Sequence, residues 1–220
     1  MSAEASPNGK ALRLPRDERR RQLLSAAHEV FVVHGFHGAA MDDIAEAAKV
    51  SKPVLYQHFP GKLELYLAIL DLHNAELLAG VKAAMDATDN NKARVAAAIS
   101  AYFEFVDRED APFRLVFESD LTNDIAVRQR VDLVEKTISH AIADIITEDA
   151  GLARPEAELL GVAMAGMAQV SARYWLQSQR RIPREAAADL IAQLSWRGIR
   201  AFPKTSSPSA DSGDGADPGS

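Results

Sequence analysis

Residues 41–62, MDDIAEAAKVSKPVLYQHFPGK, carry the clearest structural pattern in this chain. Near its start, apolar side chains recur with the spacing of one face of a short α-helix, at Ile44, Ala45 and Ala48. Residues 49–51 then form a turn that ends on Ser51, a candidate N-cap. Pro53 fits the first turn of a second helix, because its missing amide proton needs no partner there. The pattern predicts a helix, a tight turn and a second helix over residues 52–58.

The second helix is expected to be anchored from one side only. Leu55 and Phe59 form its apolar anchor. The remaining side chains are expected to point outward, at Lys52, Val54, Tyr56, Gln57 and His58. Two short helices joined by a tight turn, with polar tips on the second, are typical of a helix-turn-helix that reads a DNA groove.

The longer segment SKPVLYQHFPGKLELYLAIL carries a Tyr-x-His-Phe pattern with a lysine three residues further on, and it resembles the signature of TetR-family transcription regulators. The resemblance extends over about residues 15–70 and to the helical remainder. Together with LPRDERRRQLL, the segment is similar to actinobacterial regulators of fatty-acid synthesis, which respond to long-chain acyl-CoA. Two positions depart from the family pattern. Met41 replaces a usual Ser or Thr, and Lys49 replaces a glycine in a left-handed turn, at a cost of about 1–2 kcal/mol.

The exposed residues of the second helix suit base and phosphate contacts. Lys52 and Gln57 can hydrogen-bond base edges, and Val54 can meet a thymine methyl group. The resemblance implies that Tyr56 and His58 lie at the groove and phosphate backbone, and that Lys62 neutralises a phosphate. A packing aromatic and a solvated histidine are the alternative readings of Tyr56 and His58. The full set of expected DNA contacts is Arg13, Arg16, Met41, Ser51, Lys52, Pro53, Val54, Tyr56, Gln57, His58 and Lys62.

Composition narrows the class of protein. The 220 residues are 47% hydrophobic, without the alternating runs that indicate strands, so we expect an all-α fold. The absence of cysteine excludes disulfides and thiolate metal sites, and we expect neither a cofactor nor a bound metal. The first residues lack the apolar run of a signal peptide, and no apolar stretch is long enough to span a bilayer. A cytoplasmic location is therefore expected.

The charge distribution favours a nucleic-acid partner at one end of the chain. The net charge is −6, which by itself argues against DNA binding. Six basic residues nevertheless lie between Lys10 and Arg21, against Asp17 and Glu18 alone. A basic segment directly before a helix-turn-helix suits phosphate contacts. The alternative is a solvated tail.

Turn signals divide the rest of the chain into helices. We expect a disordered basic arm at 1–15, a DNA-binding domain at 16–62, a helical effector-binding and dimerisation domain at 63–202, and a disordered tail at 203–220. The predicted helices cover about 16–35, 61–87, 92–107, 112–117, 122–148, 156–179 and 184–202, besides the two of the helix-turn-helix.

The last two of these helices are too apolar for a surface, and they are either the core of the domain or a face that another copy covers. The resemblance implies a four-helix dimer interface that includes Leu160, Ala163, Met167, Val170, Leu190 and Leu194. Such a homodimer would bind a palindromic operator in double-stranded DNA.

Aromatic and aliphatic side chains of the same domain form either a plain core or a ligand pocket. The resemblance implies a small apolar effector, with a long-chain acyl-CoA as the candidate. Another hydrophobic molecule that controls an efflux or catabolic gene is the alternative. The expected ligand contacts are Leu77, Leu78, Phe103, Val106, Phe117, Ile138, Met167 and Tyr174.

Two other classes of function have little support in the sequence. A carboxylate-bridged metal enzyme would need Glu-x-x-His ligands, and neither His73 nor His140 has a glutamate three residues earlier. Residues 161–166 lack the Lys-Ser/Thr that would complete a phosphate-binding loop. We therefore expect no catalytic residues. A sensor that acts only through protein partners would bind duplex DNA with little dependence on salt.

Overall fold

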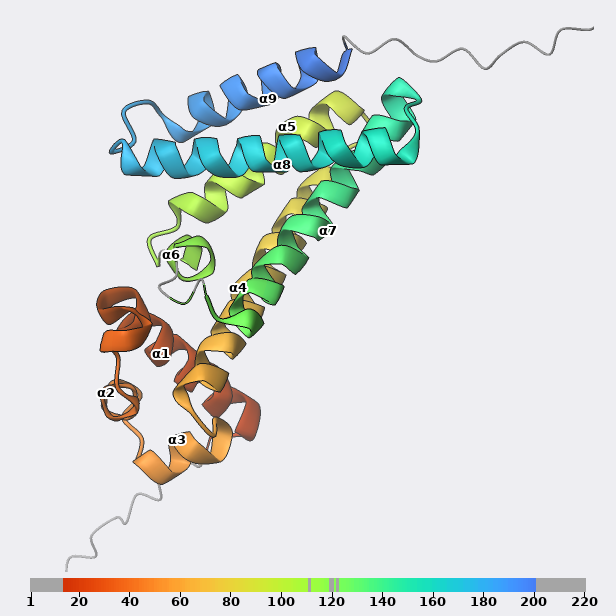
Figure 1. The fold of residues 1–220 in the computed structure, drawn as a ribbon. Coiled ribbons are helices and arrows are strands. Elements are labelled where there is room, and N and C mark those ends of the chain that lie inside the picture. The colour runs from red at the N-terminus through yellow and green to blue at the C-terminus, as the bar shows by residue number, and fades with distance from the viewer. Residues whose placement is uncertain (1–13, 111, 119–120, 122, 201–220) are drawn as a thin grey trace, which may run out of the picture. The chain divides into compact units, whose positions relative to one another are not determined.

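The computed structural model describes residues 14–110, 112–118, 121 and 123–200, and within these residues the chain is built from α-helices without strands (Figure 1). The predicted all-α class is confirmed. The helices are α1 (Arg16–Gly38), α2 (Met41–Ala47), α3 (Lys52–His58), α4 (Lys62–Asp86), α5 (Asn91–Asp107), α6 (Pro112–Phe117), α7 (Ile125–Ala150), α8 (Arg154–Gln177) and α9 (Arg184–Arg200). Apart from residues 14 and 15, the segments predicted as disordered lie outside the described residues.

The predicted ranges of α3 and α6 match the structure, whereas two later helices begin elsewhere. α7 begins at Ile125 rather than at residue 122, because the Asp124 carboxylate accepts hydrogen bonds from the next helical amides, those of Ala126 (2.8 Å) and Val127 (3.1 Å). α8 begins at Arg154 rather than at residue 156. Pro155, which directly precedes the predicted start at residue 156, lies inside the first turn of α8, where proline is tolerated.

The described residues divide into two compact units. The reading unit lies within Met1–Ala75 and Glu109–Val131, and the body unit lies within Glu76–Arg108 and Asp132–Ser220. α4 and α7 each contribute residues to both units. The sequence analysis divided the chain by function, with a DNA-binding domain that ends at residue 62 and an effector-binding domain that begins at residue 63. This functional boundary stays a prediction. None of the described helices is long and apolar enough to cross a membrane.

The core of the reading unit is built from α1, α2, α3 and the first part of α4. The side chains that fill it are almost completely buried: Leu23, Ala27, Phe31, Ile44, Leu55, Phe59, Leu65, Tyr66 and Ile69. The Tyr66 ring meets Phe31 edge-on at 5.1 Å between centroids, and the Tyr66 hydroxyl donates to the Leu115 carbonyl at 3.0 Å. α1, α4 and α6 are therefore held in one arrangement behind the helix-turn-helix.

Two buried histidines add a polar connection inside this unit. His28 Nε2 lies 2.5 Å from the Asp110 carbonyl oxygen, and His73 Nε2 lies 2.7 Å from His28 Nδ1. A carbonyl oxygen can only accept, so His28 carries its proton on Nε2 and, when neutral, accepts from His73 on Nδ1. This chain of hydrogen bonds connects α1 to α4 and to the turn before α6.

The turn between α2 and α3 is closed by the two backbone hydrogen bonds of a Schellman motif. The Val50 amide donates to the Ala45 carbonyl at 3.0 Å, and the Lys49 amide donates to the Glu46 carbonyl at 2.9 Å. This pattern requires a left-handed residue at position 49, and Lys49 has φ 53°. The predicted left-handed conformation of Lys49 is therefore confirmed.

Replacing Lys49 with glycine is expected to stabilise the protein. Glycine adopts positive φ without the steric penalty that a lysine Cβ meets, and its greater freedom in the unfolded chain offsets only part of that gain. We expect the free energy of unfolding to rise by about 0.5–1 kcal/mol. Thermal unfolding of K49G and K49A measures this. If K49A is stabilised as much as K49G, the lysine side chain and not the backbone conformation is responsible.

The body unit contains α5, α8, α9 and the C-terminal parts of α4 and α7. In Figure 1, α8 and α9 lie side by side with α5 packed against them. α7 and α8 lie very close to each other at the buried residue Gly161. A Cβ atom at this position would lie 2.3 Å from the Ser139 carbonyl oxygen and 3.2 Å from the Ala143 amide nitrogen. Only glycine allows the two backbones to approach this closely.

Candidate functional site

The reading helix α3 presents its polar side chains to solvent. Leu55 and Phe59 are 0% and 2% exposed, and they fix the helix on the core of the reading unit. The residues expected to face outward are exposed at Lys52, Tyr56 and Gln57, and half-buried at Val54 and His58. Pro53, another expected DNA contact, is also exposed. The predicted anchoring of the helix through Leu55 and Phe59 is confirmed. Contacts of the outward residues with DNA stay a prediction.

Ser51 and Met41 lie at the starts of α3 and α2, as predicted, but neither side chain makes a capping hydrogen bond. Ser51 is the N-cap residue of α3, but its hydroxyl makes no capping hydrogen bond. Met41 is half-buried at the start of α2, where the Asp43 carboxylate instead accepts from the Ala40 amide at 3.3 Å. The exposed Ser51 hydroxyl therefore keeps its hydrogen-bonding capacity for a phosphate.

Lys52 is paired inside the reading unit. Its ammonium lies 2.6 Å from Asp42 Oδ2, and both side chains are about 60% exposed. The hydrogen bond and the charge of Asp42 raise the pKa of Lys52 above its usual value. This partner, on the first turn of α2, was not expected from the sequence.

Lys62 makes internal contacts that the sequence did not indicate. Its Nζ donates to the carbonyl oxygens of Phe36 at 2.7 Å and Ala39 at 2.8 Å, and it lies 4.5 Å from the centre of the Phe36 ring. These contacts hold the segment that leads from α1 into α2, beyond the break in helical geometry at Gly35. Lys62 thus positions the helix-turn-helix, whereas its expected phosphate contact stays a prediction.

A basic cluster formed by Arg16, Arg19 and Arg20 at the start of α1 lies beside the end of α3. The guanidinium of Arg20 stacks 4.4 Å above the Phe59 ring. Arg19 donates to the Gln22 side chain, which in turn donates to the Ala48 carbonyl at the end of α2. The expected contact Arg16, a member of this cluster, is exposed, and Arg13 lies outside the described residues. Positive charge is therefore concentrated beside the reading helix.

The basic cluster and partial burial affect the protonation of His58, one of the expected DNA contacts. Burial, followed by the charges of Arg16, Arg20 and Arg19, lowers the pKa of His58 below its usual value, so the folded protein favours neutral imidazole. Stability from this source is complete above the unfolded pKa of about 6.5 and declines as the pH falls below it. A phosphate beside His58 would favour the imidazolium, so DNA binding is expected to take up a proton.

DNA affinity is therefore expected to rise on acidification from about pH 7.5 to 5.5, by no more than about tenfold per pH unit for each reading head that binds. Fluorescence anisotropy of a labelled duplex at constant ionic strength measures the change. H58Q is expected to flatten the profile. An unchanged profile in H58Q would assign the proton uptake to another group.

The body unit contains a pocket of about 380 Å³ between the C-terminal parts of α4 and α7 and the start of α5. Its volume lies within the range of about 300–1,000 Å³ that is usual for small-molecule sites. The apolar lining consists of Leu78, Val81, Met85, Ile138, Ala141 and Ile145. The polar lining consists of Lys82, Asp86, Arg94, Thr137, Asp144 and Glu148.

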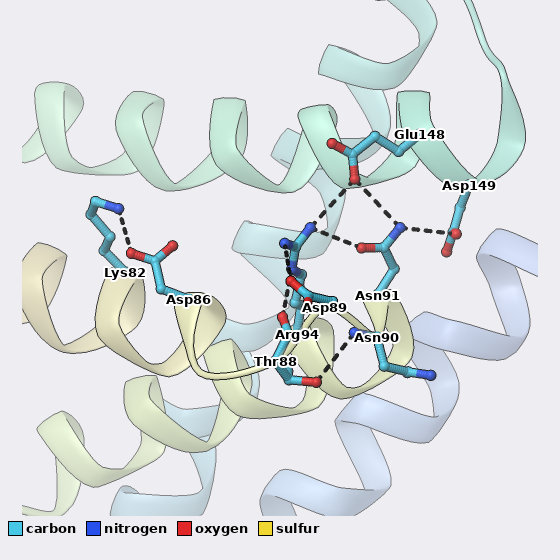
Figure 2. A network of polar contacts seen from close by, with 9 residues as sticks. All are labelled: Lys82, Asp86, Thr88, Asp89, Asn90, Asn91, Arg94, Glu148 and Asp149. Carbon is cyan, nitrogen blue, oxygen red and sulfur yellow. Dashed lines mark hydrogen bonds and ion pairs between the residues drawn. The ribbon is translucent and has the colours of Figure 1, made fainter.

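A polar network fixes Arg94 at this pocket (Figure 2). Its guanidinium donates to the Thr88 carbonyl at 2.9 Å and to Asn91 Oδ1 at 3.1 Å, and it lies 3.4 Å from Glu148 Oε2. Asn91 also donates to Asp149 Oδ1 at 3.0 Å. The network ties the start of α5 to the end of α7. Lys82, the other basic residue that lines the pocket, pairs with Asp86 at 2.5 Å.

The expected ligand contacts separate into four groups. Leu78 and Ile138 line the pocket. Leu77, Phe103 and Val106 are at most 2% exposed and belong to the packed core of the body unit, and Met167 and Phe117 are half-buried outside the lining. Tyr174 is 70% exposed, so it cannot line a closed pocket of this chain. The sequence pattern identified apolar faces but could not separate core from pocket.

An exposed apolar face covers parts of α8 and α9. Large hydrophobic side chains there are 55–71% exposed, at Leu159, Val162, Val170, Tyr174, Leu190 and Leu194. Among the other expected interface residues, Ala163 is exposed, whereas Leu160 and Met167 are half-buried. Large exposed apolar side chains on two helices that pack against each other are expected to belong to a binding face.

The sequence of this chain is similar to known proteins, both in the helix-turn-helix segment and over nearly its whole length. Residues 23–69 match the family described as bacterial regulatory proteins, tetR family. The chain is 43% identical over 203 residues to the HTH-type transcriptional activator FasR of Mycolicibacterium smegmatis, covering 92% of this chain and 93% of that protein.

Solved structures share the fold as well. A TetR-like transcriptional regulator from Rhodococcus sp. RHA1 is 27% identical, with a TM-score of 0.72 over 86% of this chain and 99% of that one. FadR of Bacillus subtilis, solved in complex with stearoyl-CoA, is 18% identical, with a TM-score of 0.68 over 80% of this chain and 96% of that one.

Proposed function

The chain belongs to the TetR family of bacterial regulatory proteins, and we propose that it is a homodimeric transcription regulator whose operator binding is controlled by a long-chain acyl-CoA. The observation that carries the DNA-binding part is the reading helix α3, buried through Leu55 and exposed at Tyr56 and Gln57, beside the basic cluster of α1. The identity of 43% with a transcriptional activator, over nearly all of both chains, supports the same assignment.

The pocket of the body unit is the proposed effector site. Its apolar lining suits an acyl chain, and Lys82 and Arg94 are the basic residues in its lining that could meet an anionic headgroup. A protein of the same fold was solved with stearoyl-CoA, which supports this class of ligand. Genes of fatty-acid and lipid metabolism are the proposed targets.

Helix α4 is the proposed connection between effector and operator. Lys82 and Met85 of α4 line the pocket, and Lys62 at the start of the same helix holds the segment before α2. A ligand that prefers one position of α4 would therefore change the arrangement of the two reading heads. Coupling of this kind is reciprocal and typically changes affinity by about 5- to 150-fold.

Filling the pocket is expected to remove the response to the effector and to leave DNA binding intact. In a thermal-shift titration of the wild-type protein with acyl-CoAs of increasing chain length, we expect stabilisation to grow with chain length. A ligand at about 100 times its Kd adds about 2.7 kcal/mol. A141F places a ring in the pocket and should lose the shift. A83F, exposed on α4 outside the pocket lining, should keep it.

The controls are free CoA and the matched free fatty acids. Stabilisation by none of the acyl-CoAs would contradict the proposed effector and leave a different hydrophobic molecule, such as an efflux or catabolic substrate. An equal shift in A141F would place the ligand elsewhere in the body unit. DNA affinity, measured with and without ligand, shows whether the effector strengthens or releases operator binding.

A further inference from the structure

The Asp42–Lys52 pair connects the first turn of α2 to the first residue of the reading helix. The two groups lie 2.6 Å apart, with exposed fractions of 60% and 59% for the side chains of Asp42 and Lys52. Lys52 also lies at the N-terminal end of α3, where the helix dipole disfavours a cation. Asp42 therefore holds the ammonium at a position that it would otherwise tend to leave.

The pair changes what Lys52 contributes to DNA binding. An unpaired lysine at the exposed start of a reading helix is attracted to any phosphate, and it strengthens binding to every sequence alike. Lys52 paired with Asp42 carries no net charge as a unit, so it gives up most of this unspecific attraction. The ammonium has three donors, and the bond to Asp42 leaves two that can still reach a base acceptor such as guanine O6 or N7.

We propose that Asp42 is a specificity-determining residue that directs Lys52 toward a base edge and away from the phosphate backbone. Asp42 acts through Lys52 and is a positioning residue. The inference rests on the proposed function, because it assumes that α3 reads DNA. It predicts that loss of Asp42 strengthens binding to unrelated DNA more than binding to the operator, so that the ratio of the two affinities falls.

Glu46 provides a matched control on the same helix. It lies four residues after Asp42, on the same face of α2, and is also exposed. Among the described residues, its carboxylate has no hydrogen-bond or ion-pair partner. D42N and E46Q therefore remove the same charge from the same face, but only D42N releases Lys52.

The test uses two labelled duplexes: one selected by the full-length protein from a random-sequence pool, and a scrambled duplex of the same composition. Anisotropy titrations over a range of salt concentrations give affinity and salt dependence for each. We expect D42N to bind the scrambled duplex about two- to fivefold more tightly than E46Q does. The slope of log affinity against log salt should steepen in D42N by about 0.9 for each reading head that binds, the value for one additional phosphate contact.

A second pair of variants separates the release of Lys52 from loss of charge. In a K52Q background, D42N and E46Q should have equal effects on both duplexes. If they are already equal with Lys52 present, the inference is wrong and the proposed function stands. If the wild-type protein selects no sequence and binds duplex DNA without salt dependence, the proposed function itself fails. Circular dichroism of each variant confirms that α2 and α3 remain folded.

Discussion

Replacing Leu190 and Leu194 together with glutamate is expected to make the protein monomeric and to weaken operator binding by about 100-fold or more. Each leucine is 60% exposed on α9, and the neighbouring helix α8 exposes Val170 and Tyr174. Burying this face against a second copy would remove a large apolar area from water, which favours association. Charges placed there would have to be buried unpaired and would prevent it.

The effect on DNA follows from the geometry of two linked reading heads. In a dimer, the second head binds as an intramolecular step at high effective concentration, and linkage of this kind increases affinity by about 10²–10⁴. A monomer keeps only the contacts of one α3 helix. Sedimentation velocity gives the oligomeric state, and anisotropy with the selected duplex gives the affinity.

A leucine elsewhere in the body unit serves as the control. Leu133 of α7 is 63% exposed, so L133E changes an equally accessible leucine outside α8 and α9. We expect L133E to remain dimeric and to bind DNA like the wild type. A double variant of α9 that stays dimeric would show that another surface forms the dimer.

Replacing Gly161 with alanine is expected to cause the largest loss of stability among single methyl additions in the described helices. The new Cβ would lie 2.3 Å from the Ser139 carbonyl oxygen, and this atom belongs to the backbone of α7 and cannot rotate away. The two helices must therefore separate, and overpacking of this kind costs about 1–3 kcal/mol. For a protein of this size, that corresponds to a fall in Tm of about 2–12 °C.

Gly80 of α4 provides the matched control, because a Cβ there would meet no atom within 4 Å. G80A should raise stability by about 0.5–1 kcal/mol, since alanine favours the helix. Both variants should be melted at the same protein concentration, because the proposed dimerisation would contribute to the stability. If G161A melts at or above the wild-type temperature, α7 and α8 do not approach as closely as the structure indicates.

Sequence periodicity was sufficient to predict the order of the helices and the two residues that anchor α3. Leu55 and Phe59 are spaced to bury one side of α3, and this local pattern directly specifies the exposed residues. Lys49 was also predictable, because the turn that joins the two helices needs a left-handed residue whatever its identity. These features depend on neighbours within a few positions along the chain.

Contacts between distant segments could not be predicted in the same way. Lys62 reaches the carbonyls of Phe36 and Ala39, more than twenty residues away, and no local pattern marks such a lysine as internal. The Asp42–Lys52 pair had a signal, an acidic and a basic residue at the starts of adjoining helices, but its distance depends on the turn geometry. Tyr174 is an aromatic residue of the kind that often lines a pocket, and only the packing of α8 leaves its side chain exposed to solvent.

We propose that α3 of a dimer reads a specific operator, and selection of duplexes from a random-sequence pool tests this proposal. We predict that the wild-type protein enriches a palindrome whose half-sites are related by about one helical turn, or a multiple of it. A variant with Tyr56 and Gln57 both replaced by alanine should enrich nothing. Failure of the wild type to enrich any sequence, or enrichment of the same palindrome by the α3 variant, would contradict the account.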